Sequence, residues 1–333
     1  MTDPQTAPTD AEMGAARDIL GRVEASYSAK MVGQAELRTS LLVALIAGGH
    51  ILLESVPGLA KTTAASTLAD TVQASFRRIQ CTPDLMPSDI TGTQVWDPAA
   101  TAFRTVLGPV HANIVLLDEI NRSSAKTQSA MLEAMQERQT TIGGEAHPLP
   151  RPFLVIATQN PIEQEGTYEL PEAQLDRFLL KEIVTYPTPQ DEFEVLARLD
   201  SGALDPESHV AQAASLADIE TLQGIARRVH VSEAIRNYIV GLAYVTRNPE
   251  PYIGEERARY IRYGASPRAS IAFLQASRAL ALLQGRSHVL PEDIHALRHL
   301  VLRHRVLTTF EAEADGVRPE DLVDAIFAAV PTP

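Results

Sequence analysis

Five short strand candidates, most of them apolar, recur along the first two thirds of the chain, and helical patterns separate them. The segments are 50–54 (HILLE), 76–80 (FRRIQ), 113–118 (NIVLLD), 153–158 (FLVIAT) and 179–184 (LLKEIV). The third and fourth are continuously apolar, which is typical of strands buried on both faces of a parallel sheet. Strands that alternate with helices indicate crossover connections. The sequence therefore predicts an α/β fold with a five-stranded parallel sheet.

Helical patterns precede the first strand and follow the fifth. The segment TYPTPQ (185–190) places two prolines after the fifth strand. We expect a domain boundary there, because proline lacks an amide donor and restricts the residue before it. Helices are predicted at 11–27, 34–47, 191–199, 217–229, 232–247, 267–283, 291–305 and 319–329. The expected organisation is a disordered tail over 1–12, an α/β domain over 13–187 and a helical domain over 188–333.

The composition narrows the class of protein. The 333 residues are 45% hydrophobic and 21% charged, the balance of a soluble globular protein. The N-terminus is polar and acidic, unlike a signal peptide, and no apolar run is long enough to cross a bilayer. We therefore expect a cytoplasmic protein that is not integral to a membrane. The single cysteine, Cys81, cannot form an internal disulfide and receives no role.

The segment LLESVPGLAKTT after the first strand is a variant of the phosphate-loop pattern G-x-x-x-x-G-K-[ST]. Lys61 and Thr62 match the pattern, whereas Ser55 and Ala60 occupy its two glycine positions. An alanine before the lysine is tolerable in helical geometry, and we expect Ala60 to have that geometry; Ser55 is unfavourable if its position needs a positive φ. On this segment alone, an ordinary strand, turn and helix with a surface lysine is an equally good interpretation.

Acidic and amide side chains end the third and fourth strands. Asp118 can hold Mg²⁺, and Glu119 can orient and polarise the water that attacks a γ-phosphate. Asn160, in ATQNP, can bond that water or the γ-phosphate, because the carboxyl ends of parallel strands meet at one edge of the sheet. The alternatives are solvated acids in a turn and an Asn-Pro turn. Next to Lys61 and Thr62, the phosphate-transfer interpretation is favoured.

Three segments carry a family resemblance: 108–144, 153–178 and GASPRA at 264–269. They closely resemble the MoxR class of AAA+ ATPases, and the match extends over most of the chain. The resemblance implies a P-loop nucleotide-binding α/β core with strand order 5-1-4-3-2, followed by an α-helical lid domain. It also implies a ring, usually hexameric, that binds Mg-ATP between subunits.

The resemblance also implies residue roles. By motif, Lys61 and Thr62 match Walker A, Asp118 and Glu119 match Walker B, and Asn160 matches sensor 1. The implied metal ligands are Thr62 and Asp118. The implied nucleotide contacts are Val32, Gly33 and Gln34 in the adenine-contacting turn, with Val56, Pro57, Gly58, Leu59, Ala60, Lys61, Thr62 and Thr63 in the phosphate loop.

Two arginines complete the implied site. Arg177 in LDRF matches the arginine finger, and Arg268 in GASPRA matches sensor 2. A planar, permanently charged guanidinium suits the charge that develops on a transferred phosphoryl group. The segments at about 91–110 and 138–151 resemble the helix-2 insert and the pre-sensor-1 hairpin of this clade; ordinary surface hairpins are an equal alternative.

The leading functional hypothesis is an ATP-driven, chaperone-like remodeller that matures a client protein complex, beside a partner with a von Willebrand factor A domain. A nucleic-acid motor is one alternative. The net charge of -13 counts against it, because phosphates are repelled from an acidic surface. A scaffold that binds nucleotide without hydrolysing it is another, but the predicted site has roles that passive binding does not need.

Overall fold

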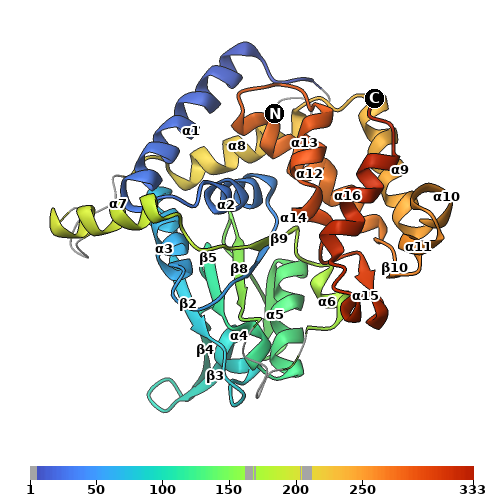
Figure 1. Cartoon of the computed structure of the whole chain (residues 1–333). Coiled ribbons are helices and arrows are strands. Elements are labelled where there is room, and N and C mark those ends of the chain that lie inside the picture. The colour runs from blue at the N-terminus through green and yellow to red at the C-terminus, as the bar shows by residue number, and fades with distance from the viewer. Residues whose placement is uncertain (1–5, 162–167, 169, 203, 205–211) are drawn as a thin grey trace. The chain divides into compact units, whose positions relative to one another are not determined.

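The computed structural model describes residues 6–161, 168, 170–202, 204 and 212–333 (Figure 1). The chain forms two compact units. The first, called the sheet unit, comprises Asp18–Leu170 and Glu182–Thr221. The second, called the helical unit, comprises Met1–Arg17, Pro171–Lys181 and Leu222–Pro333. The units therefore interleave along the chain, and the predicted division at 187 and 188 stays a prediction.

The sheet unit is built on a five-stranded sheet in the order β2-β5-β8-β1-β9. Its strands are β1 (Ile51–Glu54), β2 (Phe76–Gln80), β5 (Ile114–Asp118), β8 (Leu154–Gln159) and β9 (Leu180–Ile183). Pairs β2·β5, β5·β8 and β8·β1 are parallel. Counting only these strands in chain order, the arrangement is 5-1-4-3-2, so the predicted fold is confirmed. The apolar residues of β5 and β8 are buried, as expected for central strands.

Helices and two hairpins complete the sheet unit. Its helices are α2 (Ala35–Ala47), α3 (Lys61–Thr71), α4 (Pro87–Thr91), α5 (Ala125–Glu137) and α7 (Pro189–Asp200), with a 3₁₀ turn η1 (Ile120–Arg122). The antiparallel hairpins are β3 (Gly92–Asp97) with β4 (Ala102–Leu107), and β6 (Gln139–Ile142) with β7 (Glu145–Pro148). Each hairpin lies within one of the two segments assigned to family inserts.

The helical unit packs α9 (Glu233–Arg247), α12 (Pro267–Leu283) and α16 (Pro319–Ala329) around an aromatic cluster. Its other helices are α6 (Glu172–Leu175), α10 (Glu250–Ile253), α11 (Glu255–Ala258), α13 (Pro291–Ala296), α14 (Arg298–Leu302) and α15 (Phe310–Ala314). A two-stranded sheet joins β10 (Ile261–Tyr263) to β11 (Leu307–Thr308). Phe327 packs edge-on against Tyr238, with ring centroids 6.3 Å apart, and also contacts Phe273. Helices α1 (Asp10–Lys30) and α8 (Leu216–Arg228) each continue from one unit into the other.

Two sequence predictions were wrong in detail. Residues 10–12 were assigned to the tail, but α1 begins at Asp10 because Thr9 and Glu12 cap it reciprocally, with N–H to side-chain oxygen distances of 2.8 and 3.3 Å. The single helix predicted over 291–305 is two helices, because the chain turns at Leu297, where ψ is -2°. The second helix ends at Leu302, and Arg305 beyond it makes buried contacts with 176–179.

Among the described residues, no helix combines the length and the apolar character needed to cross a bilayer.

Candidate functional site

The loop between β1 and α3 has an unusual backbone at Gly58 and Ala60. Gly58 has φ 87°, and Ala60, the residue that caps α3, has φ 52° and ψ 25°. The expectation that Ala60 has ordinary helical geometry is therefore wrong. A left-handed conformation brings the Cβ of an alanine close to the following carbonyl, which is why glycine is the usual residue there. The loop carries this strain at the position next to Lys61.

Ser55, at the other variant position, is not strained. It is absent from the described residues with positive φ, and its N–H donates to the Gln159 carbonyl at 3.1 Å. This bond extends the pairing of β1 with β8 by one residue. The buried Ser55 hydroxyl donates to the Val56 carbonyl at 3.0 Å. The serine therefore fits an extended backbone, and the position does not need glycine.

The first turn of α3 presents backbone donors to the loop. Hydrogen bonding within the helix begins with the N–H of Ala64, which donates to the Ala60 carbonyl at 2.8 Å. The N–H groups of Lys61, Thr62 and Thr63 have no acceptor within the helix, as at any helix start. Together with the helix dipole, these donors favour an anion at this end of α3.

Lys61 is half-buried beside the same loop. Its ammonium donates to the Ser55 carbonyl at 3.3 Å. Burial lowers the pKa of Lys61, and the negative charges of Asp118 and Glu119 oppose that shift. The lysine is therefore within electrostatic range of the two acids.

Asp118, at the end of β5, is held by two neighbouring strands. Its Oδ1 accepts from the hydroxyl of Thr158 on β8 at 2.8 Å. Its Oδ2 pairs with Arg78 on β2, with a distance of 2.5 Å to Nη2. The sequence prediction included neither Thr158 nor Arg78. Thr158 lies in the ATQNP motif, which was a signal for it, whereas Arg78 is an exposed residue of the adjacent strand.

Glu119 turns the chain directly after Asp118. It has φ 58°, and its N–H donates to the Thr158 hydroxyl at 2.8 Å, so one hydroxyl positions both acids. The Glu119 carboxylate accepts from Arg122 Nε at 3.0 Å and from Gln80 Nε2 at 3.3 Å. Asn160 follows β8 directly and is buried. The adjacent strands β1, β8 and β5 thus bring the loop, Asn160 and the two acids to the same edge of the sheet.

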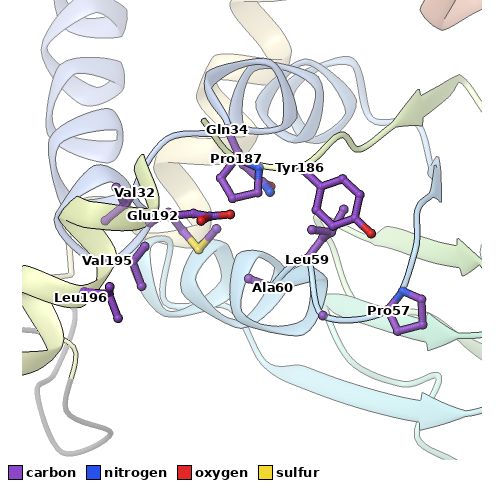
Figure 2. Close-up of a pocket in the computed structure, with 12 residues that line it drawn as sticks. Val32, Gln34, Pro57, Leu59, Ala60, Tyr186, Pro187, Glu192, Val195 and Leu196 are labelled. Atoms are coloured by element: carbon purple, nitrogen blue, oxygen red, sulfur yellow. The ribbon is translucent and has the colours of Figure 1, made fainter. Parts of the chain in front are cut away.

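A pocket of about 500 Å³ opens beside the phosphate loop (Figure 2). It is lined by Met31, Val32, Gln34, Pro57, Gly58, Leu59, Ala60, Tyr186, Pro187, Glu192, Val195 and Leu196. In Figure 2, Gln34 and Pro187 face Ala60 across the pocket. The structure therefore brings the predicted turn and the loop together. It adds the contributions of 186–187 and α7, which the sequence prediction did not include.

Close contact fixes the turn at Gly33. Its φ is 66°, and a Cβ added there would lie 2.6 Å from Cγ of Asp191. Asp191 in turn caps α7, accepting from the Thr188 hydroxyl at 2.7 Å. Glycine is therefore required at 33 both for the backbone conformation and for the approach of α7.

The arrangement fits a nucleotide with Mg²⁺. An apolar pocket suits a planar base, and the free N–H groups of α3 with the Lys61 ammonium suit phosphate oxygens. A magnesium ion needs oxygen ligands, typically one or two carboxylates with substrate phosphates, which Thr62 and Asp118 complement. Arg177 and Arg268 belong to the helical unit, Arg177 after α6 and Arg268 as the second residue of α12.

Comparison with known proteins agrees with these features. Residues 50–180 match the ATPase family associated with various cellular activities (AAA), and residues 255–326 match the AAA lid domain. The chain is 45% identical over 329 residues to the chaperone MoxR1 of Mycobacterium tuberculosis, with 98% of this chain and 86% of that protein covered. The chain belongs to the MoxR family of AAA+ ATPases. The resemblance expected from the motifs is thereby confirmed.

Two further similarities support the membership of this MoxR-family chain. The uncharacterized protein YeaC of Bacillus subtilis is 42% identical, with 95% of each chain covered. A solved structure of a candidate ATPase from Cytophaga hutchinsonii has a TM-score of 0.91 and 42% identity, covering 97% of this chain and 98% of that one. The AAA+ core and lid architecture is therefore shared along nearly the whole chain.

Proposed function

We propose that this MoxR-family AAA+ ATPase hydrolyses ATP with Mg²⁺ as a ring, usually a hexamer in this family, and uses the energy to remodel a client protein complex. The observation that supports the proposal is the placement of Asp118, Glu119 and the loop before Lys61 at the carboxyl ends of β5 and β1, on either side of β8. Passive nucleotide binding does not need a glutamate next to the metal-binding aspartate.

Different residues of the sheet unit bind the base, the phosphates and Mg²⁺. Val32, Gly33 and Gln34 hold the base in the pocket. The loop from Val56 to Ala60 and the N–H groups of Lys61, Thr62 and Thr63 hold the phosphates, and the Lys61 ammonium adds a positive charge. Thr62 and Asp118 hold Mg²⁺, which neutralises charge on the phosphate oxygens.

Glu119 and Asn160 orient the attacking water. Glu119 is anchored through its backbone by Thr158, so its carboxylate can leave Arg122 and Gln80 without displacing the strand end. Arg177 and Arg268 supply positive charge to the transferred phosphoryl group, Arg177 in the site of a neighbouring subunit. Supplying an arginine in this way couples hydrolysis to assembly.

Steady-state ATP hydrolysis tests this proposal. Glu119→Gln and Arg177→Ala should each lower kcat by about 10²-fold or more; an arginine finger is worth about 10³–10⁵ in kcat. Glu133→Gln is the matched control, because Glu133 is an exposed acid on α5. Undiminished turnover in both site variants would rule out the mechanism. Sedimentation with ATP would test the ring.

Capture of binding partners tests the remodelling function. Glu119→Gln should bind ATP without hydrolysing it and thereby retain a client and a partner with a von Willebrand factor A domain. Lys61→Ala, which should not bind ATP, is the control for nucleotide-independent capture. Hydrolysis that instead rises on addition of DNA or RNA, with a steep salt dependence, would favour a nucleic-acid motor.

A further inference from the structure

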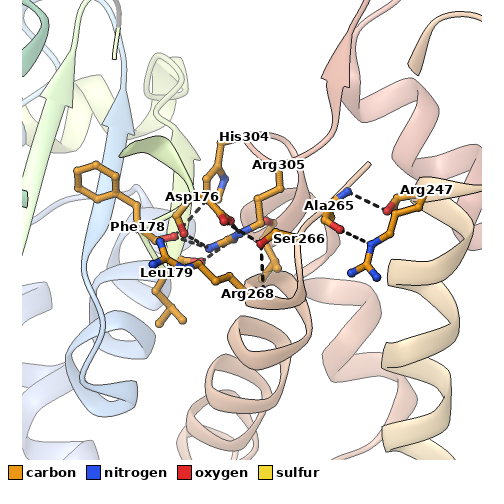
Figure 3. A network of polar contacts seen from close by, with 11 residues as sticks. Asp176, Phe178, Leu179, Arg247, Ala265, Ser266, Arg268, His304 and Arg305 are labelled. Carbon is orange, nitrogen blue, oxygen red and sulfur yellow. Dashed lines mark hydrogen bonds and ion pairs between the residues drawn. The ribbon is translucent and has the colours of Figure 1, made fainter. Parts of the chain in front are cut away.

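Asp176, which follows α6, has both carboxylate oxygens engaged within the helical unit (Figure 3). Its Oδ1 accepts from Arg305 Nε at 2.8 Å. Its Oδ2 accepts from the hydroxyl of Ser266 at 2.7 Å. The Asp176 side chain is 19% exposed and that of Arg305 is 2% exposed, so solvent screens this ion pair weakly. Asp176 directly precedes Arg177, the proposed arginine finger.

Arg305 also holds the backbone on both sides of Arg177. Its Nη2 donates to the carbonyls of Asp176 and Phe178 at 3.3 and 2.5 Å, and its Nη1 donates to that of Leu179 at 3.2 Å. The neighbouring His304 donates from Nε2 to the Phe178 carbonyl at 3.2 Å. A single buried guanidinium thus fixes the segment 176–179 from one side.

The same carboxylate reaches the helix that carries the second proposed arginine. Ser266 is the N-cap of α12, and its hydroxyl accepts from the N–H of Arg268 at 3.1 Å while donating to Asp176. Arg247 fixes the preceding turn by donating to the Ala265 carbonyl at 2.7 Å. Figure 3 shows Asp176 joined through the Ser266 hydroxyl to the start of α12. Asp176 also directly precedes Arg177 in the chain.

Arg177 and Arg268, in contrast, have no side-chain hydrogen bond or ion pair with any other described residue. Nε of Arg177 is buried without an acceptor. Burial lowers the pKa of Arg305 to about 10; the charge of Asp176 opposes that shift, whereas the charge of Arg268 adds to it. Arg268 is therefore within electrostatic reach of the pair. Arg177 adjoins Asp176 in the chain and Arg268 is two residues from Ser266, so these are the cations for which a carboxylate released from Arg305 would compete.

We propose that Arg305 is a positioning residue that withholds the Asp176 carboxylate from Arg177 and Arg268, keeping both guanidiniums available for phosphate. This inference rests on the catalytic roles proposed for those two arginines. It assigns a purpose to a buried ion pair that is not expected to increase stability much by itself. Its loss should affect kcat, because the arginines act on charge that develops during phosphoryl transfer, and should leave the KM for ATP nearly unchanged.

Steady-state hydrolysis by the full-length chain tests the positioning role. Arg305→Met should lower kcat about tenfold or more, since a freed carboxylate would neutralise an arginine that phosphoryl transfer needs. Adding Asp176→Asn should restore several-fold of that loss, because the amide has no charge with which to compete. Arg286→Met is the matched control: it breaks a second buried pair in the same unit, Arg286 with Asp293 at 2.5 Å, and should leave kcat unchanged.

A second comparison keeps the test decisive if Arg305→Met does not fold. Ser266→Ala removes the hydroxyl that occupies Oδ2 of Asp176 and should lower kcat several-fold, whereas Ser266→Thr should retain it. Ser232→Ala removes the equivalent cap of α9 and is the control for a lost helix cap.

Different outcomes separate the two proposals. Full kcat in Arg177→Ala and Arg268→Ala would overturn the catalytic roles and this inference with them. Loss of kcat in those variants, with full kcat in Arg305→Met or in Ser266→Ala, would overturn the positioning role alone. A folded double variant as inactive as Arg305→Met would also overturn it.

Discussion

Ala60 adopts a backbone conformation that an alanine rarely takes, whereas Ser55 does not. From the sequence, Ser55 looked like the weaker match to a phosphate loop and Ala60 looked harmless. The structure reverses the two. The reason is that the φ of each residue depends on where β1 ends and α3 begins, and the residue types in the motif do not specify that geometry.

We predict that Ala60→Gly stabilises the protein by about 1 kcal/mol, because glycine adopts the left-handed conformation without the cost that a Cβ imposes. Ser55→Gly should not stabilise it and should not tighten ATP binding, because Ser55 is extended and its buried hydroxyl is bonded. Urea unfolding and equilibrium ATP binding measure the two effects. A much tighter affinity for ATP in Ser55→Gly would show that this serine weakens the site.

Thr158 positions both Asp118 and Glu119 through one hydroxyl, a role that its place in the ATQNP motif did not predict. We predict that Thr158→Val lowers kcat by at least tenfold and costs about 1–3 kcal/mol of stability, because it leaves the Glu119 N–H and one Asp118 oxygen without their partner. Thr158→Ser keeps the hydroxyl and should retain most of the activity. Turnover and urea unfolding of the two variants together check this; equal kcat values would contradict the positioning role.

At the scale of elements, prolines at the first helical position made some boundaries predictable. Helices α12 and α16 have the bounds expected from Pro267 and Pro319. The end of α14 at Leu302 was not predictable from the local pattern, because Arg305 beyond it bonds to 176–179, more than a hundred residues away. Similarly, Arg78 became a partner of Asp118 only when β2 paired with β5.

His50 joins two elements of the sheet unit as a neutral side chain. Its Nδ1 accepts from the N–H of Val155 on β8 at 3.0 Å, and its Nε2 donates to the Met135 carbonyl on α5 at 3.3 Å. Burial, and then the charge of Arg138, lower the pKa of His50 to about 3. A histidine that stays neutral when folded but takes up a proton when unfolded contributes stability that is lost as pH falls below about 6.5.

We predict that His50→Gln is less stable than the unmodified chain at pH 7.5, and that this difference shrinks by about 2 kcal/mol at pH 5. Urea unfolding at the two pH values measures it. His288→Gln, at an exposed histidine, is the control and should show no such change. A constant difference across the range would mean that His50 is not held neutral.

At the scale of the whole molecule, the fold could be predicted from motifs and the strand pattern, and the site only in part. Lys61, Asp118, Glu119 and Asn160 follow neighbouring strands, so the parallel sheet alone brings them together. The contribution of Tyr186 and α7 to the pocket could not be predicted, because it depends on the path of the chain after β9.

Nucleotide binding should appear as a stability change of the whole chain. We predict that Mg-ATP at about 100 times its Kd stabilises Glu119→Gln by about 2.7 kcal/mol. Lys61→Ala should show little stabilisation at the same concentration, because the ammonium that contacts the phosphates is gone. Thermal unfolding with and without Mg-ATP measures both. An equal shift in the two variants would place the nucleotide elsewhere.

Because the two units interleave along the chain, few fragments of this protein could fold independently. The stretch Pro171–Lys181 follows β8 in sequence and includes the first two residues of β9, yet it belongs to the same compact unit as Leu222–Pro333. One cut in the polypeptide therefore cannot yield two autonomous halves: a fragment ending at 187 would keep Asp176 and lose the arginine that holds it. Exchanging the helical unit between relatives would require three grafts, Met1–Arg17, Pro171–Lys181 and Leu222–Pro333, and a lid cloned as a single C-terminal piece would lack the buried Phe178.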